Sequence, residues 1–203
     1  MIAKHANWPA PKNITALSTT RHGGYSTYPY HSNNLGLHVG DDALNVGKNR
    51  QQLTGLFNLP SQPVWLEQTH STVCVIAEEE INRQADAAIT RSAQHPLVVL
   101  TADCLPITLC DVQGTEIAAI HAGWRGLFLG IVENTLAKMN SNSSDILAWI
   151  GPAISQPYYE IGEEVYSSFT AKYPESSKSF QPHGDKWLAN LPQIAEIVLH
   201  SQG

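Results

Sequence analysis

The chain has 203 residues, 42% of them hydrophobic and 15% charged, which excludes a disordered protein and fits one globular unit with a sizeable core. Its formal net charge of -6 argues against sequence-independent binding to nucleic-acid phosphates, because such binding needs a basic surface. The three cysteines lack framework spacing and no apolar run reaches the length of a membrane span, so we predict a cytoplasmic protein that contacts neither nucleic acid nor membrane.

One strand and one helix are predicted in the first part of the chain. Residues 14–20 alternate as a strand does, and the paired glycines of the following RHGGYS favour a sharp turn that places Arg21 at a strand end. Asp41 is a good N-cap for a helix that runs to Phe57 and contains Arg50.

Short strands are predicted in the middle of the chain, where β-branched residues alternate with turn signals. They cover residues 64–68, 72–77, 87–90, 97–101, 107–110 and 116–120. Residues 97–100 are continuously apolar, which predicts a strand covered on both faces.

The last part of the chain is predicted to be mostly helical. Helical spacing covers residues 126–139, 162–171 and 191–200, and residues 146–150 read as a strand before the Gly151-Pro152 break. No repeat or linker interrupts the pattern, so we predict a mixed α/β fold in a single domain, residues 1–203.

Three residues at predicted strand ends form a candidate metal site. His70 and His121 each end a predicted strand, and Cys104 directly follows one. Strand ends present side chains at the rim of a sheet, and Zn²⁺ takes His nitrogen and Cys sulfur, with three protein ligands typical of catalytic sites. Their wide separations match no local metal motif. Two other interpretations stay open: a buried thiol beside two hydrogen-bonded histidines, or Cys104 as a nucleophile with a histidine base.

Six segments of the chain resemble, in order, the signature segments of the YfiH-like family. They are TTRHGGYS, NLGLHVGDD with NVGKNR, WLEQTH, TADCLPITL, AAIHAGWRGL and IGPAISQPYYEIGEEV. Members of this family were first named polyphenol oxidases or laccase-domain proteins and later described as purine nucleoside phosphorylases with adenosine deaminase activity. The resemblance implies a layered α-β-β-α fold and a catalytic zinc ion held by His70, Cys104 and His121.

The C-terminal end departs from the family pattern. The pattern usually continues past Ser201 into a segment with a cysteine and a Tyr-Arg-Arg-like stretch, whereas this chain stops at Gly203. We therefore expect a pocket wall and candidate phosphate-binding arginines of the family to be absent from residues 1–203.

Asp103 and Gln68 are candidates for contacting the substrate. Asp103 precedes Cys104 and can act as an acid or base near the metal, or it can accept backbone donors in its turn. Gln68 stands two residues before His70, on the same face of a strand, where it can hydrogen-bond a purine edge.

Three arginines are candidates for binding phosphate, because a guanidinium binds phosphate through two parallel hydrogen bonds. They are Arg21, Arg50 and Arg125. The alternative for each is an ion pair with a carboxylate such as Asp41, Asp42 or Glu67.

The leading functional hypothesis is zinc-dependent phosphorolysis of purine nucleosides. Adenosine, inosine and methylthioadenosine are the expected substrates with phosphate, and adenosine deamination is a second activity at the same open site. Copper can replace zinc at such ligands, so a copper-dependent polyphenol oxidase is one alternative, although the nine histidines include no His-x-His pair. The other two alternatives are a cysteine hydrolase that edits cell-wall precursors and a non-catalytic interaction module in which zinc only stabilises the fold. A structural zinc site normally has four protein ligands, and no fourth is evident.

Overall fold

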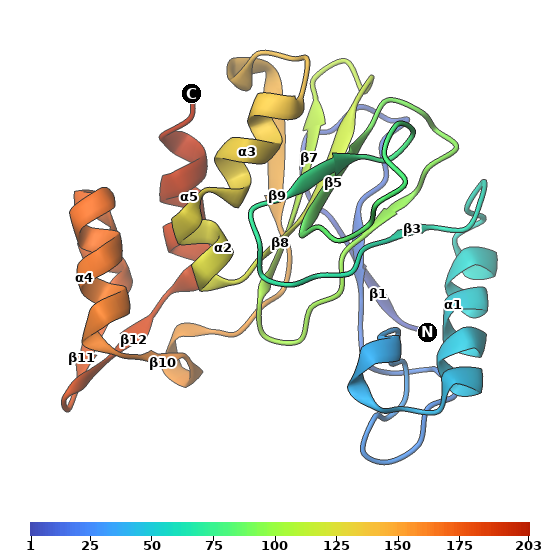
Figure 1. Ribbon diagram of the computed structural model, residues 1–203, viewed down its shortest axis with the longest axis horizontal. Coiled ribbons are helices and arrows are strands. Elements are labelled where there is room, and N and C mark those ends of the chain that lie inside the picture. Colours follow the sequence, from blue (N-terminus) through green and yellow to red (C-terminus); the bar gives the residue numbers. More distant parts are fainter.

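The computed structural model describes residues 1–203 and is built around a five-stranded sheet with the strand order β4-β5-β8-β7-β9 (Figure 1). Its strands are β4 (Cys74–Ile76), β5 (Ala87–Thr90), β7 (Leu105–Asp111), β8 (Ile117–Ala122) and β9 (Ile146–Ile150). β4 and β5 are parallel, and the other neighbours are antiparallel.

Three smaller sheets surround this central sheet. They are the antiparallel pair β1 (Ala3–His5) and β2 (Leu17–Thr19), the parallel pair β3 (Val64–Trp65) and β6 (Leu97–Val98), and an antiparallel sheet of β10 (Glu160–Ile161), β12 (Lys186–Ala189) and β11 (Phe180–His183). Neither β1 nor the β10-β12-β11 sheet was expected from the sequence.

The helices lie on two sides of the sheets. They are α1 (Ala43–Leu56), α2 (Trp124–Leu129), α3 (Ile131–Lys138), α4 (Glu163–Lys172) and α5 (Leu191–His200), with short 3-10 helices at Leu37–Val39, Ser143–Asp145, Gln156–Tyr158 and Pro174–Ser179. Helices α2, α3 and α5 lie on one side of the central sheet, and α1 lies on the opposite side of the molecule (Figure 1). This confirms the predicted mixed α/β fold. No helix combines the length and the apolar character needed to cross a membrane.

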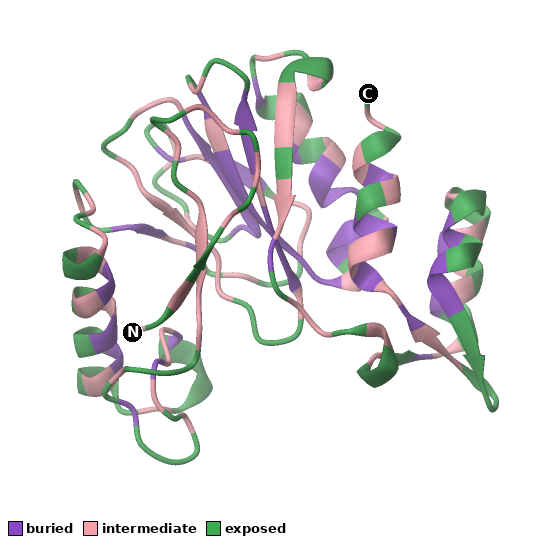
Figure 2. Cartoon of the chain, turned by 180° about the vertical axis from the view of Figure 1, so that it is seen from behind, coloured by how far each residue is buried: buried purple, intermediate pink, exposed green.

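Strands β5, β7 and β8 of the central sheet are buried on both faces, whereas the edge strand β9 is only partly buried (Figure 2). Successive side chains of a strand point to opposite faces, so one buried strand can contribute to two clusters. On β5, Ala87 and Ile89 belong to the large core cluster shared with the helices, whereas Ala88 belongs to a smaller cluster with Val64 and Leu66. The β3–β6 pair thus covers the face that the helices leave free.

Helix α5 shows how the sequence directs a helix onto this core. Its buried residues are Leu191, Ile194, Ala195 and Val198, which recur at the spacing of one helical face. The side chain of Asn190 caps its start by accepting a hydrogen bond from the Gln193 amide.

Several predicted boundaries are wrong for local reasons. The helix expected over residues 126–139 is split by Gly130, whose φ of 104° is left-handed, into α2 and α3. The N-cap of α1 is Asp42 rather than Asp41, and it accepts hydrogen bonds from the amides of Leu44 and Asn45. Residues 97–100 are only half-buried, so the expectation of a strand covered on both faces fails.

Candidate metal centre

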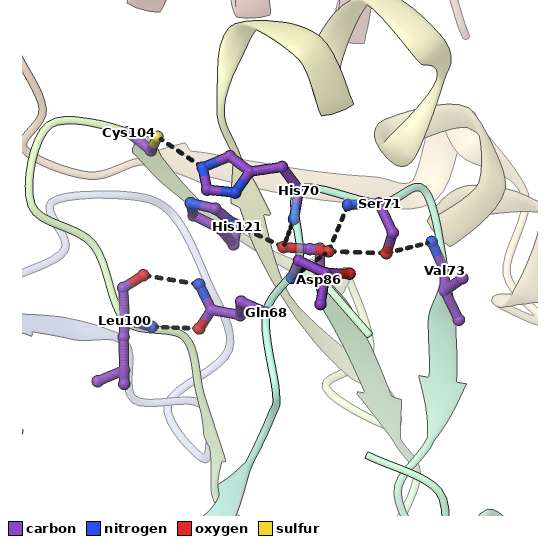
Figure 3. A network of polar contacts seen from close by, with 9 residues as sticks. Gln68, His70, Ser71, Val73, Asp86, Leu100, Cys104 and His121 are labelled. Carbon is purple, nitrogen blue, oxygen red and sulfur yellow. Dashed lines mark hydrogen bonds and ion pairs between the residues drawn. The ribbon is translucent and has the colours of Figure 1, made fainter. Parts of the chain in front are cut away.

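The three candidate ligands come together in space although they are far apart in the chain (Figure 3). The nitrogen or sulfur atoms offered by His70, Cys104 and His121 all lie within 4.8 Å of one another. Cys104 Sγ is 3.9 Å from His70 Nε2. The register of the central sheet explains part of this, because Pro106 of β7 pairs with His121 of β8 and Cys104 stands two residues before Pro106.

His70 reaches the centre from a turn rather than from a strand end. Strand β3 ends at Trp65 and β4 begins at Cys74, so His70 lies between them. Its φ of 59° is in the left-handed region, which non-glycine residues adopt rarely and often at functional sites.

His121 is buried, and one of its two ring nitrogens, Nδ1, contacts a carboxylate of the protein. Its Nδ1 lies 2.8 Å from Oδ1 of Asp86, a carboxylate with no exposed surface, which leaves Nε2 for an ion. Burial disfavours protonation of His121, but the contacts with Asp86 and Cys104 outweigh it and raise its pKa to about 9. Burial likewise opposes ionisation of Asp86, yet hydrogen bonds from His121 and Ser71 lower its pKa to about 2. A bound ion therefore has to displace a proton from His121.

Gly123 is buried directly against two of the candidate ligands. A Cβ atom placed there would lie 3.0 Å from Cδ2 of His70 and 3.1 Å from Sγ of Cys104. The two nitrogens and one sulfur suit Zn²⁺, and the cluster is open to solvent on the side of His70, which is exposed, and Cys104, which is partly exposed. The residues present thus fit one divalent ion held by three protein ligands.

Asp103 and Gln68 differ in how free their side chains are. The Asp103 carboxylate is exposed and makes no hydrogen bond within the protein, so it does not accept the backbone donors of its turn. Gln68 donates from Nε2 to the Leu100 carbonyl and accepts at Oε1 from the Leu100 amide, both at 2.7 Å. Gln68 therefore fixes the segment that leads to Cys104. Each end of its amide keeps one further hydrogen-bonding position, so the contact with a purine edge stays a prediction.

The three arginines have no carboxylate partner, which overturns the ion-pair alternative. None of the ion pairs in the structure includes Arg21, Arg50 or Arg125. Arg21 donates from Nε to the His31 carbonyl, and Arg50 donates from Nε to the Leu35 carbonyl.

Two of these arginines also contact tryptophan rings. Arg50 stacks 3.8 Å from the centre of the Trp65 ring, and Arg125 lies 5.0 Å from that of Trp124. Arg125 is exposed and stands in α2, two residues after Gly123. Of the three arginines, Arg125 is therefore the one closest in sequence to a candidate metal ligand, four residues after His121.

Three residues of this region were not predicted from the sequence to belong to the site: Asp86, Gly123 and Tyr159. A signal for Asp86 exists, because it is a lone carboxylate in the apolar run QADAAIT at the start of a buried strand. Burial raises the pKa of Tyr159 to about 12, and the nearby charges of Cys104 and Asp103 add to this shift.

The chain matches known proteins over nearly all of its length. A family model described as "Multi-copper polyphenol oxidoreductase laccase" matches residues 15–203. Over 198 residues, the chain is 45% identical to a protein of Escherichia coli K12 named purine nucleoside phosphorylase YfiH, covering 97% of this chain and 82% of that one. The chain belongs to the YfiH-like family. A YfiH-like relative from Haemophilus influenzae, also named purine nucleoside phosphorylase, is 44% identical and covers 100% of this chain and 85% of its own.

Solved structures of YfiH-like proteins have the same fold. A Neisseria meningitidis protein of family DUF152 matches with a TM-score of 0.93 at 41% identity, over 99% of this chain and 84% of that chain. YlmD from Geobacillus stearothermophilus matches with a TM-score of 0.82 at 30% identity, over 91% of this chain and 75% of that chain.

Proposed function

We propose that this protein is a metal-dependent purine nucleoside phosphorylase whose catalytic centre is formed by His70, Cys104 and His121. One observation carries the proposal. Two imidazoles and one thiol from distant segments converge beside Gly123, in a chain 45% identical to a protein named purine nucleoside phosphorylase. Such a ligand set with an open side is typical of catalytic rather than structural zinc sites.

We propose Zn²⁺ as the resident ion, with copper as the competitor that the Irving–Williams order allows. When bound, the ion supplies Lewis acidity and lowers the pKa of water toward about 7. The protein side chains do the rest. Asp86 holds His121 in place, Gly123 lets the backbone approach His70 and Cys104 closely, and the exposed side of His70 is where substrate reaches the cluster.

The Asp103 carboxylate and the arginines take the remaining roles in this proposal. Asp103 adjoins Cys104 and has no partner within the protein, so it is free to exchange a proton with the substrate. Arg125, Arg21 and Arg50 bind phosphate through their terminal nitrogens, which no carboxylate of the protein occupies. Phosphate held in line with the ribose carbon then displaces the purine base.

Adenosine, inosine and methylthioadenosine are the substrates we propose for phosphorolysis. We also propose adenosine deamination at the same centre, because that reaction needs water and proton transfer but no phosphate. The two activities therefore separate experimentally by their dependence on phosphate.

The test is the identity of the sugar product. Zinc-loaded protein incubated with inosine and phosphate is expected to release hypoxanthine and ribose 1-phosphate in equal amounts. Without phosphate, inosine is expected to stay intact while adenosine is still converted to inosine. Free ribose formed equally fast with and without phosphate would contradict the phosphorylase proposal and indicate a nucleoside hydrolase.

A second candidate function rests on the contact between Cys104 and His70. A thiol 3.9 Å from an imidazole resembles a nucleophile with its base, which suits a cysteine hydrolase acting on amide bonds. A trapped thioester or alkylated adduct at Cys104 during turnover of metal-free protein is the result that would favour it.

A further inference from the structure

We propose that Asp86 is the positioning residue of the metal centre, because its one carboxylate fixes both histidine ligands and selects the ring nitrogen that His121 offers. This inference rests on the proposed metal centre. Asp86 stands at the start of the chain segment that forms β5, between the two histidines, and none of its surface is exposed (Figure 3).

The first oxygen of Asp86 reaches both histidines. Oδ1 lies 2.8 Å from Nδ1 of His121 and accepts a hydrogen bond of 3.1 Å from the backbone amide of His70. An ionised carboxylate only accepts, so the proton of the first contact stands on Nδ1 of His121. In the neutral ring this Nδ1 proton is the one that stays, so the Nε2 lone pair is the one offered to a metal.

The second oxygen of Asp86 holds the turn that carries His70. Oδ2 accepts hydrogen bonds from the backbone amides of Thr69 and Ser71, at 3.2 and 2.6 Å, and from the Ser71 hydroxyl at 2.7 Å. Three successive amides therefore point at one carboxylate. This closed turn stabilises the left-handed backbone of His70, whose φ is 59°.

An asparagine cannot replace this carboxylate. In either orientation of the asparagine amide, its NH₂ group replaces a carboxylate oxygen and faces the N–H donors that bonded to that oxygen. The less costly orientation turns NH₂ toward His121, where it donates to Nδ1 and moves the ring proton to Nε2. That proton occupies the nitrogen that the ion needs, so Asp86→Asn weakens metal binding even where the fold survives.

The experiment measures Zn²⁺ affinity by competition with a chelating dye, without any nucleoside. Asp86→Asn is expected to raise the Kd for Zn²⁺ by about 10- to 100-fold, the usual cost of losing such an outer partner. Asp42→Asn is the matched control, since Asp42 caps α1 and asparagine caps a helix equally well. Ser71→Ala removes the hydroxyl contact with Oδ2 and the hydrogen bond that this hydroxyl accepts from the Val73 amide, but it keeps the carboxylate. It is expected to change the Kd by less than about threefold.

A measurement on the unmodified protein covers the case in which Asp86→Asn does not fold. In protein loaded with Cd²⁺ as a probe, ¹⁵N NMR of His121 is expected to show the ion at Nε2 and a hydrogen-bonded proton on Nδ1. The ion at Nδ1 would overturn the proposal. So would a folded Asp86→Asn variant that binds Zn²⁺ as the control does, or an equal loss in Ser71→Ala, which would mean that the carboxylate only holds the turn.

These outcomes separate this inference from the proposed function. If Asp86→Asn loses Zn²⁺ affinity but the unmodified protein leaves inosine intact, the phosphorylase proposal fails and the role of Asp86 stands. If inosine is cleaved and Zn²⁺ affinity is unchanged in Asp86→Asn, the role of Asp86 fails and the phosphorylase proposal stands. An unmodified protein that binds neither Zn²⁺ nor Cd²⁺ refutes the metal centre and this inference together.

Discussion

Replacing Gly123 by alanine adds a single methyl group directly against two of the proposed metal ligands. The backbone of Gly123, with φ of −67° and ψ of 160°, suits any residue, so the variant tests the methyl group and not backbone strain. The new carbon would lie 3.0 Å from His70 Cδ2 and 3.1 Å from Cys104 Sγ. Ordinary contacts between carbon atoms are about 3.5–4.0 Å, so both side chains have to move apart by roughly half an ångström.

The expected cost follows from this overlap. Overpacking of a well-filled site costs about 1–3 kcal/mol, which corresponds to roughly a 5- to 150-fold change in a binding constant. Because the displaced groups are the ligands themselves, we expect Gly123→Ala to raise the Kd for Zn²⁺ within that range. The metal-free variant is expected to keep its Tm within a few degrees, since the side chains are free to separate when no ion holds them.

The assay is a Zn²⁺ competition titration combined with thermal unfolding of the metal-free protein. Gly47→Ala is the matched control, because it lies inside α1 and a Cβ there meets nothing within 4 Å. That control is expected to leave Zn²⁺ affinity unchanged and to raise stability by about 0.5–1 kcal/mol, as alanine does in a helix interior. Gly123→Ala with the affinity of the unmodified protein would refute the reasoning that a glycine is needed here for His70 and Cys104 to keep their positions as ligands.

Three further predictions concern accessibility, pH and phosphate. Alkylation of metal-free protein near pH 8, followed by mass spectrometry, is expected to modify Cys104 and to spare Cys74 and Cys110. Those two thiols are buried, and burial raises their pKa values to about 11. Bound Zn²⁺ is expected to protect Cys104 from alkylation. Because the pKa of His121 is raised to about 9, its protonated form stabilises metal-free protein fully below its ordinary pKa of about 6.5, and this contribution disappears as the pH rises through 9. The affinity for Zn²⁺ is expected to rise over the same window, and a flat profile from pH 6.5 to 9 by competition titration would contradict the proton displacement. Arg125→Met is expected to raise the KM for phosphate several-fold while adenosine deamination continues, and equal losses in both reactions would argue against a phosphate-binding role.

The sequence predicted elements best where the signal is local. The bounds of β5, β9 and α5 agree with the structure, because each combines an apolar pattern with clear turn or capping residues. Strands β1 and β10 have two or three residues and exist only through pairing with distant segments, which no local pattern reports. The break at Gly130 was hidden by apolar spacing that continues across it.

The residues of the candidate site likewise fall into those that the sequence predicted and those that only the structure reveals. Residue chemistry at strand ends and the family resemblance pointed to His70, Cys104 and His121, which converge in the structure. The contacts of Asp86 with two of them depend on the register of β5 against β8 and on the path of a turn, and neither can be read from the chain. For the same reason, the contacts of Gln68 with Leu100 could not be foreseen.

The substitution of Cys104 by alanine, followed by parallel measurement of zinc content and inosine phosphorolysis, tests the central claim most directly. The thiolate supplies one of three ligands and much of the charge that holds the ion, so its loss is expected to abolish zinc retention and turnover together. The buried Cys110→Ala variant serves as the control for a lost thiol and is expected to keep both. Loss of turnover with full zinc occupancy in Cys104→Ala would contradict the metal-centre account and favour Cys104 as a covalent nucleophile.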